Sequence, residues 1–186
     1  KRRLSAGVGT GNGKLQMNHT LEEYEPIVGI PSVRQLRLLG SRLSGVRVVH
    51  INSTREGGGV AEILNWMIPL MRDVGLDASW EVISGTPRFY EITKAIHNGL
   101  QGNPVQITAD DWSLLREVNA EWAVAHRDSL REAEIVIIHD PQPAPLIESI
   151  RDRKGKWIWR GHIDVSRPHR PVWKNLRSIV EQYDAS

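Results

Sequence analysis

The feature that most constrains this sequence is an alternation of short β-rich runs with longer helical stretches. Runs rich in β-branched and aromatic residues predict strands at 46–51, 79–84, 134–138 and 156–160. Helices are indicated at 60–71, 88–97, 111–131, 144–153 and 172–183. Strands that alternate with helices form parallel sheets covered by their crossovers. We therefore predict an α/β fold with a Rossmann-like, mostly parallel sheet and helices on both faces.

The chain divides into three parts. Residues 1–16 contain four glycines among small residues and predict a flexible tail. Residues 17–45 predict an N-terminal helical extension whose packed face carries Val33, Leu36, Leu39 and Leu43 at helical spacing. Residues 46–186 form the predicted Rossmann-like domain, in which Pro69 should kink the first helix.

Composition excludes several classes of function. The formal net charge is only +2, from 24 basic and 22 acidic side chains without a long basic run, so nucleic-acid binding is not expected. There are no cysteines, which excludes disulfides, thiolate zinc sites and a cysteine nucleophile. We see no membrane-spanning stretch and no secretory signal in 1–16, and we expect a soluble, cytoplasmic protein with no membrane partner.

Ligands of parallel α/β sheets collect outside the carboxyl ends of the strands. After the first predicted strand, Gly57, Gly58 and Gly59 precede a helix, where free backbone N–H groups can hold an anion or sugar hydroxyls. They do not match the dinucleotide fingerprint, because Glu62 stands where its third glycine belongs. A flexible turn is the alternative interpretation.

Polar residues also follow the third predicted strand. They are His139, Asp140 and Gln142, and they lie in a loop that alternating prolines stiffen. Each has a structural alternative: Asp140 could cap the next helix, and His139 could be a core histidine with satisfied hydrogen bonds.

The fourth predicted strand places two tryptophans on one face and then releases Arg160, His162 and Asp164. Packing for His162 and a turn or helix cap for Asp164 are the alternatives. A His-x-Asp pair also occurs in metal sites, but without further ligands at a recognised spacing we expect no metal. Three polar strand ends at one edge favour a sugar, because a polyol needs many hydrogen-bond partners in one preformed cleft.

Three segments carry a family resemblance. Residues 48–63 (VVHINSTREGGGVAEI), 137–146 (IIHDPQPAPL) and 157–166 (WIWRGHIDVS) resemble glycosyltransferase family 4, specifically its trehalose synthases. The resemblance covers roughly 21–184 and implies the N-terminal, acceptor-side half of a retaining glycosyltransferase of the GT-B type. It implies that this chain lacks the C-terminal donor domain and is inactive alone.

The same resemblance implies substrates and roles. The implied partners are a nucleoside-diphosphate-glucose together with glucose or trehalose, the donor domain, and a second copy of the chain as a candidate; no cofactor is required, since the nucleotide sugar is a substrate. The glycines would lie near the donor phosphates, Asp140 and Gln142 on acceptor hydroxyls, and His162 near the donor glucose. The predicted catalytic residues are Asp140 and His162, and the predicted substrate-binding residues are Gly57, Gly58, Gly59, His139, Gln142, Arg160 and Asp164. A trehalose phosphorylase of the same family and a non-catalytic sugar-binding or interaction module are the rival interpretations.

Overall fold

The computed structural model describes residues 19–186, so the predicted tail over 1–16 lies outside the described residues. In chain order its elements are a short 3₁₀-helix η1 (Leu21–Tyr24), α1 (Glu25–Val28), α2 (Ile30–Arg42), β1 (Arg47–Asn52), α3 (Gly59–Asp73), β2 (Asp77–Val82), α4 (Pro87–Leu100), α5 (Ala109–Glu132), β3 (Ile135–His139), α6 (Leu146–Ser149), β4 (Lys156–Arg160) and α7 (Arg170–Val180).

The strands form one four-stranded sheet in the order β2-β1-β3-β4, and every pairing is parallel. His50 of β1 lies opposite Trp80 of β2 and Ile137 of β3, which fixes the register on both sides. The chain builds outward from β1 to β2 and then crosses back to β3. The strand order therefore reverses between β1 and β3, where ligands of such sheets bind. The predicted α/β fold is confirmed.

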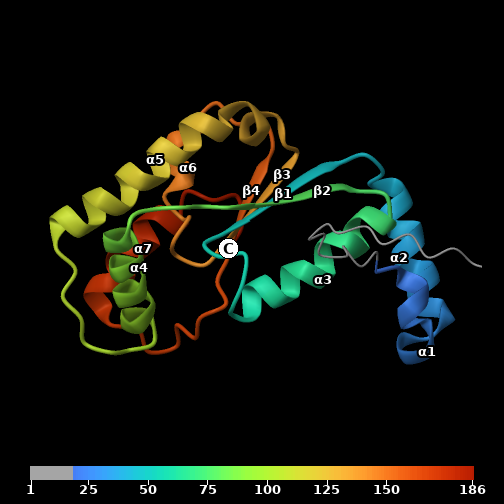
Figure 1. The fold of residues 1–186 in the computed structure, drawn as a ribbon, viewed down its shortest axis with the longest axis horizontal. Coiled ribbons are helices and arrows are strands. Elements are labelled where there is room, and N and C mark those ends of the chain that lie inside the picture. The colour runs from blue at the N-terminus through green and yellow to red at the C-terminus, as the bar shows by residue number, and fades with distance from the viewer. Residues whose placement is uncertain (1–18) are drawn as a thin grey trace, which may run out of the picture.

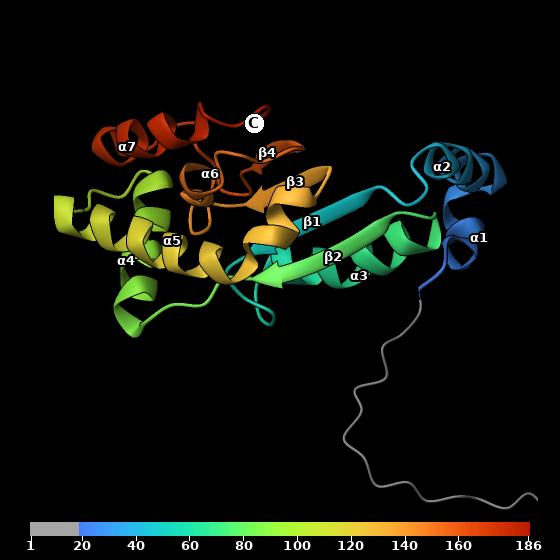
Figure 2. The same ribbon diagram turned by 90° about the horizontal axis from the view of Figure 1, so that it is seen from above.

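Helices lie on the two faces of the sheet (Figures 1 and 2), and each face has its own core. On one face, Leu64 and Ile68 of α3 pack with Ala78 and Trp80 of β2. The other face is covered mainly by α4, α5 and α7, whose buried side chains join Trp157 and Trp159 of β4 in the larger core. Trp157 and Trp159 share that face, as their spacing of two predicted. Val49 and Ile51 of β1 and Val136 and Ile138 of β3 also join the larger core, whereas β2 contributes to the smaller one.

One predicted helix is much shorter in the structure. The sequence predicts a helix over 144–153, but α6 ends at Ser149, and Ile150 has left helical geometry with φ −115° and ψ 68°. The chain must then turn back tightly into β4. At Gly155 an added Cβ would lie 2.1 Å from the carbonyl oxygen of Ala133 at the end of α5. The close approach of this turn to α5 leaves no room for further helical turns.

The N-terminal extension is helical, but its predicted packed face is wrong. Val33 is buried, whereas Leu36, Leu39 and Leu43 are 46%, 46% and 44% exposed. The helix instead packs through a small residue: an added Cβ at Gly40 would lie 2.4 Å from the carbonyl oxygen of Val74. Figure 1 shows α1 and α2 at the end of the molecule opposite α4 and α7.

Polar contacts hold this extension to the end of α3. The backbone N–H of Leu21 donates to the Asp73 carboxylate at 2.9 Å, and Arg37 Nη2 donates to the same oxygen at 2.8 Å. Helix α3 continues through Pro69 to Asp73, and the predicted kink stays a prediction. It stops before Gly75, whose φ of 103° suits glycine. Within residues 19–186, no helix is both long and apolar enough to cross a membrane.

Candidate functional site

A cavity of about 440 Å³ lies at the carboxyl edge of the sheet, where the strand order reverses. Its walls come from the end of β1 with the following loop and the start of α3, the end of β3 with the following loop, the residues after β4, and one residue of α4. They are Asn52, Ser53, Thr54, Gly57, Gly58, Gly59, Val60, Ala61, Ile63, His97, His139, Asp140, Gln142, His162 and Ile163. The predicted gathering of three polar strand ends at one edge is thereby confirmed.

The glycine loop gives one wall its shape. Gly57 and Gly58 have φ values of 73° and 99°, in the left-handed region that side chains disfavour. Gly58 is the N-cap of α3 and offers no side chain to the first turn. The first N–H groups of a helix have no partner inside it, so this terminus presents hydrogen-bond donors and a positive partial charge at the wall.

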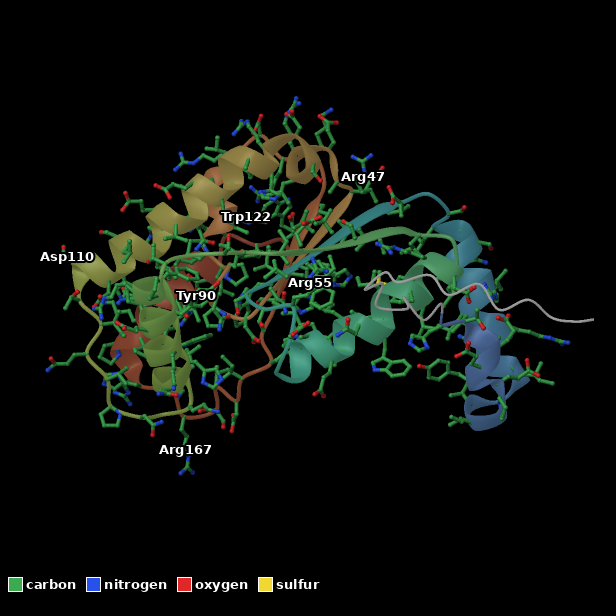
Figure 3. The ribbon with its side chains drawn as sticks, in the orientation of Figure 1. Arg47, Arg55, Tyr90, Asp110, Trp122 and Arg167 are labelled. Atoms are coloured by element: carbon green, nitrogen blue, oxygen red, sulfur yellow. The ribbon has the colours of Figure 1, made fainter. Side chains whose placement is uncertain are left out.

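Residues on β1 and β2 hold the loop in place. The Asn52 side chain donates to the carbonyl of Thr54 at 2.8 Å and accepts from the Trp80 indole N–H at 2.8 Å. The Arg55 guanidinium lies over the Trp80 ring, 4.3 Å from its centroid, and donates to the Trp80 carbonyl at 3.1 Å. Figure 3 shows Arg55 in the middle of the molecule and Arg47 near the opposite end of β1. The loop is therefore anchored rather than a free turn.

Asp140 adopts an unusual backbone conformation, with φ 65°. Its own N–H donates to the Arg160 carbonyl at 3.0 Å, and its carbonyl accepts from the Trp159 indole at 3.0 Å. Its carboxylate accepts from the backbone N–H of His162 at 2.7 Å. Helix α6 begins after Pro145 with no side-chain cap, so the helix-cap interpretation of Asp140 is wrong. Left-handed non-glycine residues of this kind are concentrated at functional sites.

The environment of Asp140 disfavours its charge. Burial raises the pKa of the Asp140 carboxyl above its usual range, while the hydrogen bond from the His162 backbone acts against this increase. The positive charges that His162 and His97 can carry also act against it. A carboxylate that is half-buried, yet backed by an N–H donor and two imidazoles, can take a strong hydrogen bond from a sugar hydroxyl.

Three histidines are linked in a row beneath this wall. His50 Nδ1 lies 3.0 Å from His139 Nε2, and His139 Nδ1 lies 2.9 Å from His162 Nε2. Burial is the main cause that lowers the pKa of His50 to about 4 and that of His139 to about 3, so both rings are neutral at pH 7. His139 is fully buried with both ring nitrogens bonded, which leaves neither nitrogen free for a ligand.

Two further side chains at the cavity have polar atoms available. The Gln142 side-chain oxygen is buried with no hydrogen-bond partner among the described residues, while its backbone carbonyl accepts from Asn119 at 3.0 Å. His97 reaches the cavity from the last turn of α4. A buried, unpaired amide oxygen beside a polar cavity is suited to a ligand hydroxyl, because leaving it unpaired is costly.

Two residues predicted to bind substrate lie outside the cavity lining. Arg160 is exposed at the end of β4, and its backbone carbonyl serves Asp140. Asp164 caps a turn: its carboxylate accepts from the backbone N–H of Ser166 at 2.9 Å and from its hydroxyl at 2.5 Å. These bonds lower the pKa of Asp164. The geometry therefore agrees with the turn interpretation of Asp164.

The structure also adds residues that sequence reasoning did not select. Asn52 is the last residue of β1, the strand that leads into the glycine loop, and a polar side chain in this largely apolar run is a signal that could have identified it. His50 carries the same signal. His97 carries none, because its approach to the cavity depends on how α4 packs against the sheet edge.

Comparisons with known proteins find relatives that are similar over most of this chain. The trehalose synthase of Thermococcus litoralis is 47% identical over 165 residues, which cover 88% of this chain and 39% of that protein. A trehalose phosphorylase of Pleurotus pulmonarius is 28% identical over 197 residues, covering 92% of this chain and 26% of that protein. This chain thus spans about two fifths of the length of the synthase it matches.

A solved structure supports the fold. A trehalose 6-phosphate synthase from Burkholderia multivorans superposes with a TM-score of 0.52 at 17% identity, over 76% of this chain and 39% of that one. Residues 50–186, which include every cavity-lining position, match the family described as trehalose synthase, N-terminal domain. The chain belongs to the trehalose synthase N-terminal domain family.

Proposed function

We propose that this chain is the acceptor-side half of a retaining glycosyltransferase that moves glucose from a nucleoside-diphosphate-glucose to glucose, forming trehalose. The observation that carries the proposal is the convergence of the glycine loop, Asp140, Gln142 and His162 on one cavity at the reversal of strand order. Family membership supports the reaction class.

The acceptor glucose would lie against the wall after β3. There Asp140 offers a carboxylate and Gln142 an unpaired amide oxygen, both of which accept hydrogen bonds from hydroxyls. The carboxylate is held on its protein side by the His162 backbone N–H. Asp140 would thus orient the acceptor hydroxyl rather than attack the sugar.

The donor phosphate would approach the start of α3. As the bond from glucose C1 to the diphosphate oxygen breaks, negative charge builds on the leaving group and positive charge on the sugar ring. The first-turn N–H groups after Gly58 are fixed donors for that negative charge. The acceptor oxygen bonds to C1 on the same face, and its proton passes to the leaving diphosphate, so the configuration is retained. No cofactor enters this scheme.

The rest of the donor site would be supplied by sequence outside this chain, which matches 39% of the length of its synthase relative. We therefore expect residues 1–186 alone to form no trehalose. The assay belongs to the product of the complete reading frame, supplied with nucleoside-diphosphate-glucose and glucose. Proton NMR of the product identifies the α configuration at the transferred glucose that retention requires, and the α,α linkage that defines trehalose.

A matched pair of carboxylate variants tests the site. Asp140→Asn keeps the oxygen that accepts from His162 and tolerates the left-handed backbone, but removes the charge. It should lower turnover by roughly ten- to a hundredfold, the worth of one charged hydrogen bond in the transition state. Asp164→Asn removes an equivalent charge outside the cavity lining and should change turnover less than about threefold. Equal turnover in both variants would contradict the assignment.

The second candidate is a trehalose phosphorylase, because the Pleurotus pulmonarius phosphorylase is similar over 92% of this chain. The two reactions share a sugar acceptor site and differ in the group that carries the transferred glucose. Phosphate-dependent release of glucose 1-phosphate from trehalose, without activity on nucleoside-diphosphate-glucose, would favour the phosphorylase.

A further inference from the structure

His50 is a buried polar group that neither the proposed mechanism nor the cavity lining uses. It lies on β1, one strand away from His139, and its Nδ1 is 3.0 Å from His139 Nε2. His139 in turn contacts His162 Nε2 at 2.9 Å, and His162 lines the cavity. A continuous path of hydrogen bonds therefore joins a fully buried side chain to the ligand site.

Each nitrogen–nitrogen contact in this path can hold only one proton. His50 and His139 are neutral at pH 7, so each ring carries one proton and one lone pair. In the first arrangement His50 donates from Nδ1 to His139 Nε2. His139 must then donate from Nδ1 to His162 Nε2, and a neutral His162 carries its proton on Nδ1. In the second arrangement His162 donates from Nε2 to His139 Nδ1, His139 donates from Nε2 to His50 Nδ1, and His50 carries its proton on Nε2. The three tautomers are thus set together.

The buried end of the path distinguishes the two arrangements. His50 Nε2 is buried and has no hydrogen-bond partner among residues 19–186. In the second arrangement this atom would be a buried N–H without an acceptor, which costs the desolvation free energy of that donor. In the first arrangement it is a lone pair, which leaves no donor unpaired. The first arrangement, with every proton directed toward His162, is therefore favoured.

We propose that His50 is a positioning residue that, through His139, holds His162 as the Nδ1–H tautomer, so that His162 presents a hydrogen-bond donor to an oxygen of the bound sugar. The identity of that ligand rests on the function proposed above. The opposite tautomer would present a lone pair and could act as a base. His162 is thus assigned to binding an oxygen atom, and not to removing a proton.

Ring-nitrogen NMR on the ¹⁵N-histidine-labelled chain at pH 7.5 tests this directly, because protonated and unprotonated ring nitrogens have distinct shifts. In the wild type we expect His162 to carry its proton on Nδ1. His50→Leu removes the donor and should increase the Nε2–H form of His162, whereas His50→Asn replaces the donor with an amide N–H and should retain the Nδ1–H form. An Nε2–H tautomer in the wild type overturns the proposal, whether or not the Leu variant folds. An unchanged tautomer in a folded Leu variant does so too.

Kinetics give a second readout, with the product of the complete reading frame. His50→Leu should lower kcat/KM for the nucleotide sugar by about fivefold, as expected for one neutral hydrogen bond, and His50→Asn should restore most of it. KM for glucose should stay within about twofold of wild type, because Asp140 and Gln142 are unchanged. His126→Leu is the matched control, since His126 is on α5 outside the cavity lining.

The outcomes separate the two proposals. If His50→Leu and the control His126→Leu lost the same activity and the same melting temperature, His50 would have a structural role, and the inference would be overturned. The tautomer measurement uses no substrate, so it stands even if the wild-type enzyme makes no trehalose, a result that would count against the proposed function alone.

Discussion

Acidification should destabilise this fold through its two buried imidazoles. Burial lowers the pKa of His50 from 6.5 to about 4 and that of His139 from 6.5 to about 3. The folded state therefore binds fewer protons than the unfolded state below pH 6.5. The free energy of unfolding must fall as the pH drops through this window, and the loss is complete once the pH is below the folded pKa values.

The magnitude follows from the two shifts. At pH 5 the unfolded side chains are almost fully protonated and the folded ones largely neutral, so each histidine should cost about 2 kcal/mol relative to pH 7.5. Together they should cost about 4 kcal/mol, a large part of the 5–15 kcal/mol that is typical of a folded domain. Asp140 acts with the opposite sign, because its pKa is raised in the folded state.

Urea unfolding at pH 7.5 and pH 5.0, followed by tryptophan fluorescence, measures this loss. Trp157 and Trp159 are buried beside β3 and report on unfolding of the same sheet. The His50→Asn variant isolates the histidine effect: it keeps Asp140 but should lose only about 2 kcal/mol over the same pH change. The reasoning would be refuted if the free energy of unfolding changed equally with pH in the wild type and in His50→Asn. A wild-type loss below about 1 kcal/mol between pH 7.5 and pH 5.0 would refute it too.

Two further predictions concern the glycine loop. An alanine Cβ at Gly59 meets no described atom within 4 Å, and the backbone there is outside the left-handed region. Gly59→Ala should therefore leave the free energy of unfolding in urea unchanged or raise it by up to about 1 kcal/mol. Turnover should fall, because the added methyl group lies at the wall of the cavity. Gly58→Ala is the contrast, since φ is 99° there and alanine should cost roughly 1–2 kcal/mol. Trp80→Phe removes the indole N–H that donates to Asn52 and should lower the free energy of unfolding in urea by about 1–3 kcal/mol. Trypsin should also cleave the loop after β1 faster in this variant. Unchanged cleavage would show that the indole does not anchor the loop.

The sheet and its binding edge could be predicted because both follow from local patterns. Apolar runs at strand length alternate with helical stretches, and parallel connections bring all carboxyl ends to one edge. Strand bounds differ by at most two residues: the predicted 79–84 is observed as Asp77–Val82, whereas the predicted 156–160 matches Lys156–Arg160. The ends of the first, third and fourth strands meet at one cavity, and predicting this needed only the strand positions and the parallel connections.

The packed face of α2 and the approach of His97 to the cavity could not be predicted, because both depend on packing partners that are distant in sequence. The leucines of α2 have helical spacing, but the surface they would need is absent among the described residues, and the helix docks through Gly40 instead. The contact is made by the smallest residue because two backbones approach there, and hydrophobic periodicity does not register a glycine. His97 reached the site in the same way, through the packing of α4 rather than any local pattern.

Polar residues near the ends of apolar strands are the sequence signal that could have predicted more of the site. His50, Asn52 and His139 are all almost fully buried in strands whose other positions are mainly apolar. Burying a polar side chain is costly unless it is hydrogen-bonded, so each must meet another polar group. The spacing of two places His50 and Asn52 on the same face of β1. The register, with His50 opposite Ile137, makes His139 the diagonal neighbour of His50 and turns two isolated histidines into one path that ends at the cavity.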